Sequence, residues 1–177
     1  MFKTALTYGA ISGVVIIGVI LLGLRFGDEH GRGLFSSEWF GYLVMILSLS
    51  TIFIAIRDYR NKKLGGVIKF FPAFVMGLLI ALIAGIAYVA AWEAYLFATH
   101  YAFMDNYVAA MAERARAHMS GPALAAQLAE LEQMRVAYQN PLFRFGMTFI
   151  EIFPVGFLIA LISAAILRNP RVLPARA

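Results

Sequence analysis

Two glutamates in apolar surroundings are the residues best suited to chemistry in this sequence. Glu151 lies within MTFIEIFPVGFLIALISAAILRNP, and Glu93 directly follows YVAAW. A charged group at the centre of a bilayer costs on the order of 3 kcal/mol, so such a carboxyl faces the helix bundle and is either paired or protonated. The two carboxyls therefore predict either an ion pair that locks helices together or a site that handles protons, ions or lipid headgroups.

Cationic and hydroxyl partners are available for Glu151 at a matching depth. Arg25 and Arg144 are the candidate cations, and Thr148 lies between Arg144 and Glu151 on the same helix face. Counting about 1.5 Å per helical residue places these groups and Glu93 near one boundary of the bilayer. We therefore treat Glu151, Glu93, Arg144, Arg25 and Thr148 as one candidate intramembrane polar site.

Pro154 is a second reason to expect a polar group near Glu151. Proline has no backbone N–H, so the carbonyl of Ile150 loses its helical donor. A protonated Glu151, a water molecule or a neighbouring hydroxyl would supply the missing donor. Pro154 is therefore predicted to break the helix.

The sequence contains no pattern typical of other catalytic or binding sites. The sequence has no cysteine, and its histidines, His30, His100 and His118, are too scattered to form a metal-ligand pair. Phosphate-binding, dinucleotide-binding and nucleophile-elbow motifs are missing as well. We predict no metal, no cofactor and no enzymatic activity, with acid–base catalysis by Glu93 and Glu151 as the least favoured alternative.

The elements that carry these residues follow from composition. Hydrophobic residues make up 62% of the 177 positions and charged residues only 14%. The apolar residues form four blocks, each near the roughly 20 residues that a helix needs to cross a bilayer. These blocks span about 5–24, 39–56, 70–99 and 142–167. The predicted fold is a single all-α membrane domain, residues 1–177, with four transmembrane helices and an extramembrane helical hairpin between the third and fourth.

Basic residues predict the orientation of the chain in the membrane. Segments rich in Lys and Arg stay in the cytoplasm, and each such residue near an anionic surface contributes about 1 kcal/mol of attraction. This composition predicts a cytoplasmic loop in contact with anionic lipid, both termini in the cytoplasm, and no binding to nucleic acid. The basic residues of the loop are Arg57, Arg60, Lys62, Lys63 and Lys69.

The connection of about 100–140 is predicted to be a periplasmic helical hairpin. Two stripes recur at helical spacing: Met104, Val108, Met111, Ala115 and His118, then Leu124, Leu128, Leu131, Arg135 and Tyr138. The sequence Ser120-Gly121-Pro122 separates them and is typical of a helix end followed by a helix start. We expect the third span to continue outward as one long helix, with the second arm returning to Asn140-Pro141. The stripes either cover each other or bind a protein partner.

Small residues recur four positions apart on three of the spans. Such faces let helices approach closely in lipid, where no hydrophobic force favours association. Packing within one protomer is the favoured reading, and a homo-oligomer interface is the alternative. The residues are Gly9 and Gly13, then Gly77, Ala81 and Gly85, then Gly156, Ala160 and Ala164.

Two long segments resemble a bacterial family of small four-span membrane proteins known as a domain of unknown function. They are GYLVMILSLSTIFIAIRDYRNKKLGGVIKFFPAFVMGLLIALIAGIAYVAAWE and YQNPLFRFGMTFIEIFPVGFLIALISAAILR, with an IRDYR-type loop and an E-x-x-P-V-G pattern. The resemblance implies a bacterial inner-membrane location and the four-span plan. It implies no activity, substrate or cofactor.

Three functions follow from these features. The favoured one is a non-enzymatic assembly or interaction protein, which should tolerate Glu151→Gln and depend on its hairpin. The second is a small transport or lipid-handling unit that uses Glu151 and works as a homo-oligomer, because four helices enclose little space. The third is the membrane enzyme described above.

Overall fold

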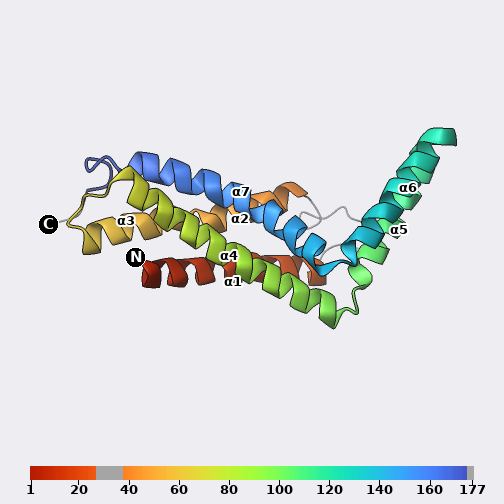
Figure 1. Cartoon of the computed structure of the whole chain (residues 1–177), viewed down its shortest axis with the longest axis horizontal. Coiled ribbons are helices and arrows are strands. Elements are labelled where there is room, and N and C mark those ends of the chain that lie inside the picture. The colour runs from red at the N-terminus through yellow and green to blue at the C-terminus, as the bar shows by residue number, and fades with distance from the viewer. Residues whose placement is uncertain (27–37, 175–177) are drawn as a thin grey trace. The chain divides into compact units, whose positions relative to one another are not determined.

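The computed structural model describes residues 1–26 and 38–174, and in these residues the chain forms seven helices and no strands (Figure 1). The all-α fold class is therefore confirmed. The helices are α1 Phe2–Phe26, α2 Glu38–Leu49, α3 Thr51–Lys63, α4 Phe70–Ala98, α5 Ala102–His118, α6 Gly121–Tyr138 and α7 Pro141–Leu167.

Four of the described segments are long and apolar enough to cross a membrane. They are Phe2–Val19, Trp39–Lys63, Phe70–Ala98 and Pro141–Leu167, the second being formed by α2 and α3 together. The protein is thus a multi-pass membrane protein with a helical hairpin, α5 and α6, between the last two spans.

The second span continues further than its apolar run, which ends at 56. Helix α3 carries on to Lys63, and the carboxylate of Asp58 accepts a hydrogen bond from Lys62 Nζ at 2.5 Å, one turn later. Such pairs stabilise exposed helical turns. The helix ends where Gly65 and Gly66 adopt positive φ angles of 64° and 93°. Part of the expected basic loop is therefore helical.

The described chain divides into two compact units. One comprises Met1–Val89 and Phe149–Ala177, and the other comprises Ala90–Thr148. We call them the span unit and the hairpin unit. The span unit contains α1, α2, α3 and most of α4 and α7; the hairpin unit contains α5, α6, the last turns of α4 and the first turns of α7.

Small residues set the helix spacing in the span unit. A Cβ added at Gly77 in α4 would lie 2.6 Å from the Cβ of Ala160 in α7, and one at Gly156 would lie 2.7 Å from the Cβ of Ala81. A Cβ at Gly13 in α1 would likewise lie 2.7 Å from the Cβ of Ala87 in α4. The small residues therefore pack helices of one protomer together, which is the interpretation that the sequence favoured.

Hydroxyl groups provide polar contacts between α1 and its neighbours in the same unit. Ser12 Oγ of α1 lies 2.5 Å from Thr51 Oγ1 and donates to the carbonyl of Ser48 at 3.2 Å. Nearer to the basic loop, the hydroxyl of Tyr8 donates a hydrogen bond to Asp58 Oδ2 at 3.3 Å. These bonds join α1 to α2 and α3 and satisfy hydroxyls that have no water partner in lipid.

Arg60 departs from its expected role in the lipid-facing loop. It is fully buried, and its guanidinium donates to the carbonyls of Leu167 at 3.2 Å and Leu173 at 2.5 Å. Its Nε also donates to Asn61 Oδ1 at 2.8 Å. Carbonyls at the end of a helix have no intrahelical donor, so Arg60 completes the C-terminal end of α7.

Replacing Arg60 by methionine should therefore destabilise the protein by about 2 kcal/mol, because carbonyls that Arg60 now satisfies would lose their donor. Thermal unfolding in detergent measures the loss. Lys63, which is exposed in the same helix, supplies the matched control. Equal unfolding temperatures for Arg60→Met and Lys63→Met would show that the buried guanidinium is dispensable.

Pro154 does not break the fourth span. Helix α7 runs without interruption from Pro141 to Leu167 with Pro154 inside it, so the prediction of a helix break is wrong. In lipid, opening the helix would expose several backbone groups that cannot find water, whereas proline itself removes one donor. The bilayer therefore favours the continuous helix.

The hairpin unit contains two helices that cover each other's apolar stripes. Helices α5 and α6 pack side by side (Figure 1). Met104, Ala112, Ala115 and Leu131 are buried. His118, at the end of the first stripe, is exposed. The chain turns between His118 and Gly121, as the sequence predicts.

The third span does not continue into the hairpin as one long helix. Helix α4 ends at Ala98, and His100 and Tyr101 have positive φ angles of 52° and 58°. The N–H of Tyr101 donates to the carbonyl of Leu96 at 2.7 Å, a bond that is typical of a helix ending in a left-handed turn. Neither residue is a glycine, so the sequence carries no common signal for this turn.

Candidate functional site at the base of the hairpin

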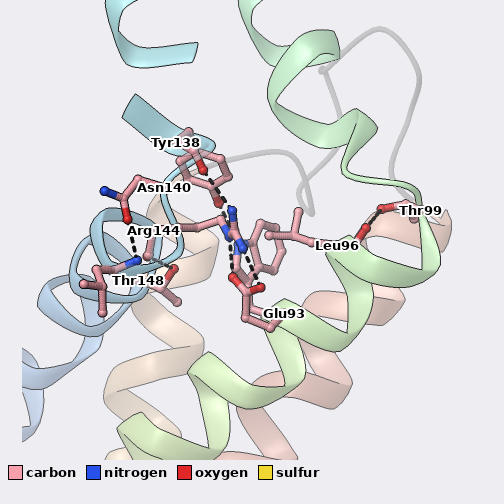
Figure 2. Close-up of polar contacts among 9 residues, drawn as sticks. Glu93, Leu96, Thr99, Tyr138, Asn140, Arg144 and Thr148 are labelled. Atoms are coloured by element: carbon pink, nitrogen blue, oxygen red, sulfur yellow. Dashed lines mark hydrogen bonds and ion pairs between the residues drawn. The ribbon is translucent and has the colours of Figure 1, made fainter. Parts of the chain in front are cut away.

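A buried ion pair joins the end of α4 to the start of α7 in the hairpin unit. Arg144 Nε donates to Glu93 Oε1 at 2.5 Å, and Arg144 Nη2 donates to Glu93 Oε2 at 2.8 Å (Figure 2). The Arg144 side chain is 5% exposed and that of Glu93 20%. Two parallel bonds between a guanidinium and a carboxylate are the strongest arrangement of such a pair.

The first turn of α7 fixes the position of Arg144. Asn140 accepts a hydrogen bond from the N–H of Leu142 through its side-chain Oδ1 at 2.9 Å, and Pro141 occupies the first helical position. Thr148 Oγ1 donates back to the carbonyl of Arg144 at 2.9 Å (Figure 2). Thr148 thus supports the helix that carries Arg144.

Two tyrosine rings lie close to the guanidinium of Arg144. Its carbon lies 5.0 Å from the ring centre of Tyr101 and 5.8 Å from that of Tyr138, distances suited to cation–π attraction. Arg144 Nη1 also donates to the carbonyl of Tyr138 at 2.9 Å, and Trp92 Nε1 donates to the Tyr138 hydroxyl at 2.9 Å. Arg144 therefore contacts residues at both ends of the hairpin.

This arrangement is suited to a structural role. Both oxygens of Glu93 accept hydrogen bonds from Arg144, so the carboxylate and the guanidinium hold α4 and α7 together through two contacts. Removing one partner of such a buried pair usually costs about 3–5 kcal/mol, because the other charge is left uncompensated. We call this Glu93–Arg144 pair the lock, because it holds the base of the hairpin in place.

A cavity of about 330 Å³ opens next to this lock. Every residue that lines it belongs to the hairpin unit, and two of these residues are arginines. The lining consists of His100, Tyr101, Met104, Asp105, Arg135, Tyr138, Gln139, Pro141 and Arg144.

Ion pairs on the hairpin hold Arg135 at the cavity wall. Arg135 donates to Glu132 from Nε at 2.9 Å and from Nη2 at 2.7 Å, and reaches Asp105 of α5 from Nη1 at 3.4 Å. The hydrogen bonds from Arg135 lower the pKa of Glu132, and those same bonds raise the pKa of Arg135. Asp105 and Arg135 thus link α5 to α6.

The lowered pKa of Glu132 predicts the direction of a pH effect on the hairpin. A carboxyl whose pKa is lower in the folded state stabilises that state above its unfolded value of about 4.3, and this stabilisation is lost as the pH falls through the folded pKa. Hydrogen exchange of α6 amides should show weaker protection below about pH 4 in the wild type. Glu132→Gln should remove that change, whereas Glu130→Gln should retain it.

Glu151 lies in the span unit, in a setting unlike that of Glu93. It is exposed on α7, and the hydroxyl of Tyr88 in α4 donates to its Oε2 at 3.4 Å. The carboxyl therefore meets the buried Tyr88 of α4, while the residue as a whole keeps exposed surface. The side chain of Arg25 lies outside the described part of the chain.

The structure therefore divides the predicted polar site between the two units. Glu93, Arg144 and Thr148 come together in the hairpin unit, where Arg144, an expected partner of Glu151, pairs with Glu93. The aromatic neighbours Tyr101, Tyr138 and Trp92 were not predicted. Within the described residues, no group of three His, Asp or Glu side chains is placed to hold a metal ion.

Most of the chain matches a known family. The model of DUF4199, a protein family of unknown function, matches residues 7–169, which include the hairpin, three complete spans and the first span from residue 7 onward. The chain belongs to the DUF4199 family. No curated protein and no solved structure matches this DUF4199 chain.

Proposed function

We propose that this DUF4199 protein is a non-enzymatic membrane protein that presents its α5–α6 hairpin, outside the membrane, to a protein partner. The observation that supports this proposal most directly is the arrangement around Arg144. Its guanidinium binds Glu93 and the Tyr138 carbonyl and lies beside two tyrosine rings, which fixes the hairpin at its base. A fixed hairpin loses little conformational entropy when a partner binds.

The same proposal includes location and orientation. Lys and Arg gather near the α3–α4 connection and after α7, whereas the hairpin carries both signs of charge. The positive-inside rule favours both termini in the cytoplasm and the hairpin on the opposite side of the membrane. The family resemblance favours a bacterial inner membrane, in which the hairpin would lie in the periplasm.

Because the sequence has no cysteine, single cysteines can test this orientation without a background. A membrane-impermeant maleimide added to intact spheroplasts should label Ala110→Cys in α5 and leave Lys63→Cys unlabelled until the cells are lysed. Both positions are exposed in the folded protein. The opposite labelling pattern would place the hairpin in the cytoplasm and refute the proposed orientation.

Photo-cross-linking in living cells tests the proposed interaction. A photoreactive amino acid replaces Val136, which is 55% exposed in the hairpin, or Ile54, which is 48% exposed in the second span. We expect a protein adduct of one defined mass from position 136 and none from position 54. The adduct should persist in Glu151→Gln and be lost in Arg144→Met, whose hairpin is no longer fixed.

A second candidate function rests on Glu151, a partly exposed residue that carries a carboxyl group in an apolar helix. This observation favours a transport or lipid-handling unit in which Glu151 exchanges protons, assembled as a homo-oligomer. Liposomes that contain the purified protein and an internal pH dye measure proton flux under an imposed potential. Flux equal to that of empty liposomes supports the interaction protein, whereas flux abolished by Glu151→Gln would favour the transport unit.

A further inference from the structure

The cavity of the hairpin unit lies where two membrane spans end. Its lining comes from residues 100–105, directly after the span that ends at Ala98, and from residues 135–144, around the start of the span at Pro141. In a bilayer these positions lie at the depth of the lipid headgroups. A ligand of this cavity is therefore most accessible from the headgroup layer.

Two guanidinium groups supply hydrogen-bond donors to the cavity. An arginine carries five N–H groups. Arg135 and Arg144 each use three of theirs in the hydrogen bonds described above, so two on each remain for a ligand among the described contacts. Paired guanidinium groups are well suited to the oxygens of a phosphate.

The charge balance indicates that a ligand with a phosphate alone is not the best match. The lining contains two arginines and one aspartate, but Glu93 and Glu132 already pair with the arginines. The two arginines, Arg135 and Arg144, are thus balanced by three carboxylates, those of Asp105, Glu93 and Glu132. Asp105, whose side chain is 65% exposed, accepts a bond from Arg135 through Oδ1, which leaves Oδ2 for a cation. A zwitterion that carries both a phosphate and an ammonium group satisfies both kinds of charge.

Backbone strain is concentrated in the wall of the cavity. His100 and Tyr101 are two of the three non-glycine residues with positive φ in the described part of the chain, and both line the cavity. Such conformations cost on the order of 1–3 kcal/mol each and often occur at binding sites. The turn places the Tyr101 ring beside Arg144, so the strain contributes to the shape of the site.

Apolar side chains beside the cavity indicate that the ligand carries acyl chains. Leu142 and Phe143 follow the lining residue Pro141 and are 79% and 40% exposed. Both lie in the first turn of a membrane span. They provide a lipid-facing surface next to the polar lining.

We propose that this cavity binds the headgroup of a zwitterionic phospholipid, with its phosphate on Arg135 and Arg144 and its ammonium on Asp105. This site goes beyond the proposed interaction function and does not depend on it, since it requires only that α4 and α7 span the membrane. The acyl chains would lie along Leu142 and Phe143.

Trp92 provides a direct readout, because its indole donates to Tyr138 in the cavity wall and the chain has only two tryptophans. The full chain is purified in detergent with Trp39→Phe, so that fluorescence reports on Trp92. It is titrated with dihexanoyl phosphatidylethanolamine, dihexanoyl phosphatidylglycerol and free phosphoethanolamine. We expect saturable binding of phosphatidylethanolamine, with each of the other two binding about tenfold more weakly.

Three variants separate the contacts. Arg135→Gln should weaken binding of phosphatidylethanolamine about tenfold, and Asp105→Asn should bring the two phospholipids to equal affinity. Arg116→Gln, at an exposed position of α5 outside the cavity, should bind as the wild type does. Circular dichroism of each variant verifies that it is folded.

Several results would overturn the proposal. Absence of a saturable response to phosphatidylethanolamine would show that no headgroup binds. Equal affinities for Arg135→Gln and Arg116→Gln would exclude the cavity. Phosphatidylglycerol binding as tightly as phosphatidylethanolamine would exclude the ammonium contact, and free phosphoethanolamine binding as tightly would exclude a lipid ligand.

Discussion

Replacing Arg144 by methionine should destabilise the hairpin unit by about 3 kcal/mol or more, because the carboxylate of Glu93 would remain largely buried without its cation. The variant also loses the bond to the Tyr138 carbonyl and the contacts with both tyrosine rings. Thermal unfolding in detergent, followed by tryptophan fluorescence, measures the change. Arg116→Met is the matched control, since Arg116 is exposed in the same unit.

The double variant Glu93→Leu with Arg144→Met distinguishes a lost pair from lost packing. Replacing both members of a buried pair by apolar residues is often close to neutral, so the double variant should be more stable than Arg144→Met alone. A stability of Arg144→Met within about 0.5 kcal/mol of Arg116→Met would show that the pair is not a lock.

Replacing Gly77 by valine should destabilise the span unit by about 3 kcal/mol, because the new side chain cannot fit between α4 and α7 without moving them apart. Its Cβ would lie 2.6 Å from the Cβ and 3.1 Å from the Cα of Ala160, and the latter is backbone that cannot rotate away. Unfolding in detergent, followed by circular dichroism, measures the loss.

Gly41 in α2 supplies the matched control for this prediction. A Cβ at Gly41 meets no described atom within 4 Å, so Gly41→Val should stay within about 1 kcal/mol of the wild type. Similar losses for the two valine variants would indicate that helix propensity, and not the close approach of α4 and α7, determines the result.

The sequence predicts the spans and the hairpin because both depend on local patterns. Apolar runs of sufficient length must lie in lipid, and the two stripes of the hairpin must be covered at helical spacing. Met104 and Leu131, one from each stripe, are indeed buried. These features need no knowledge of distant contacts.

The details that the sequence does not predict depend on tertiary contacts. Glu93 and Arg144 are 51 positions apart, and only folding decides that they pair with each other. Arg60 looks like its exposed neighbours in the basic loop, but it is buried because the end of α7 requires donors. The left-handed turn at His100 and Tyr101 has no glycine to signal it.

A distance measurement between spin labels tests most directly whether the ion pair fixes the hairpin. Ala94→Cys in α4 and Glu113→Cys in α5 place labels at two exposed positions of the hairpin unit, in a chain without other cysteines. Pulsed electron paramagnetic resonance in lipid nanodiscs gives the distribution of the distance between them. We predict one narrow distribution in the wild type and a broad one in Arg144→Met. A broad distribution in the wild type, or equal widths in both proteins, would contradict the account.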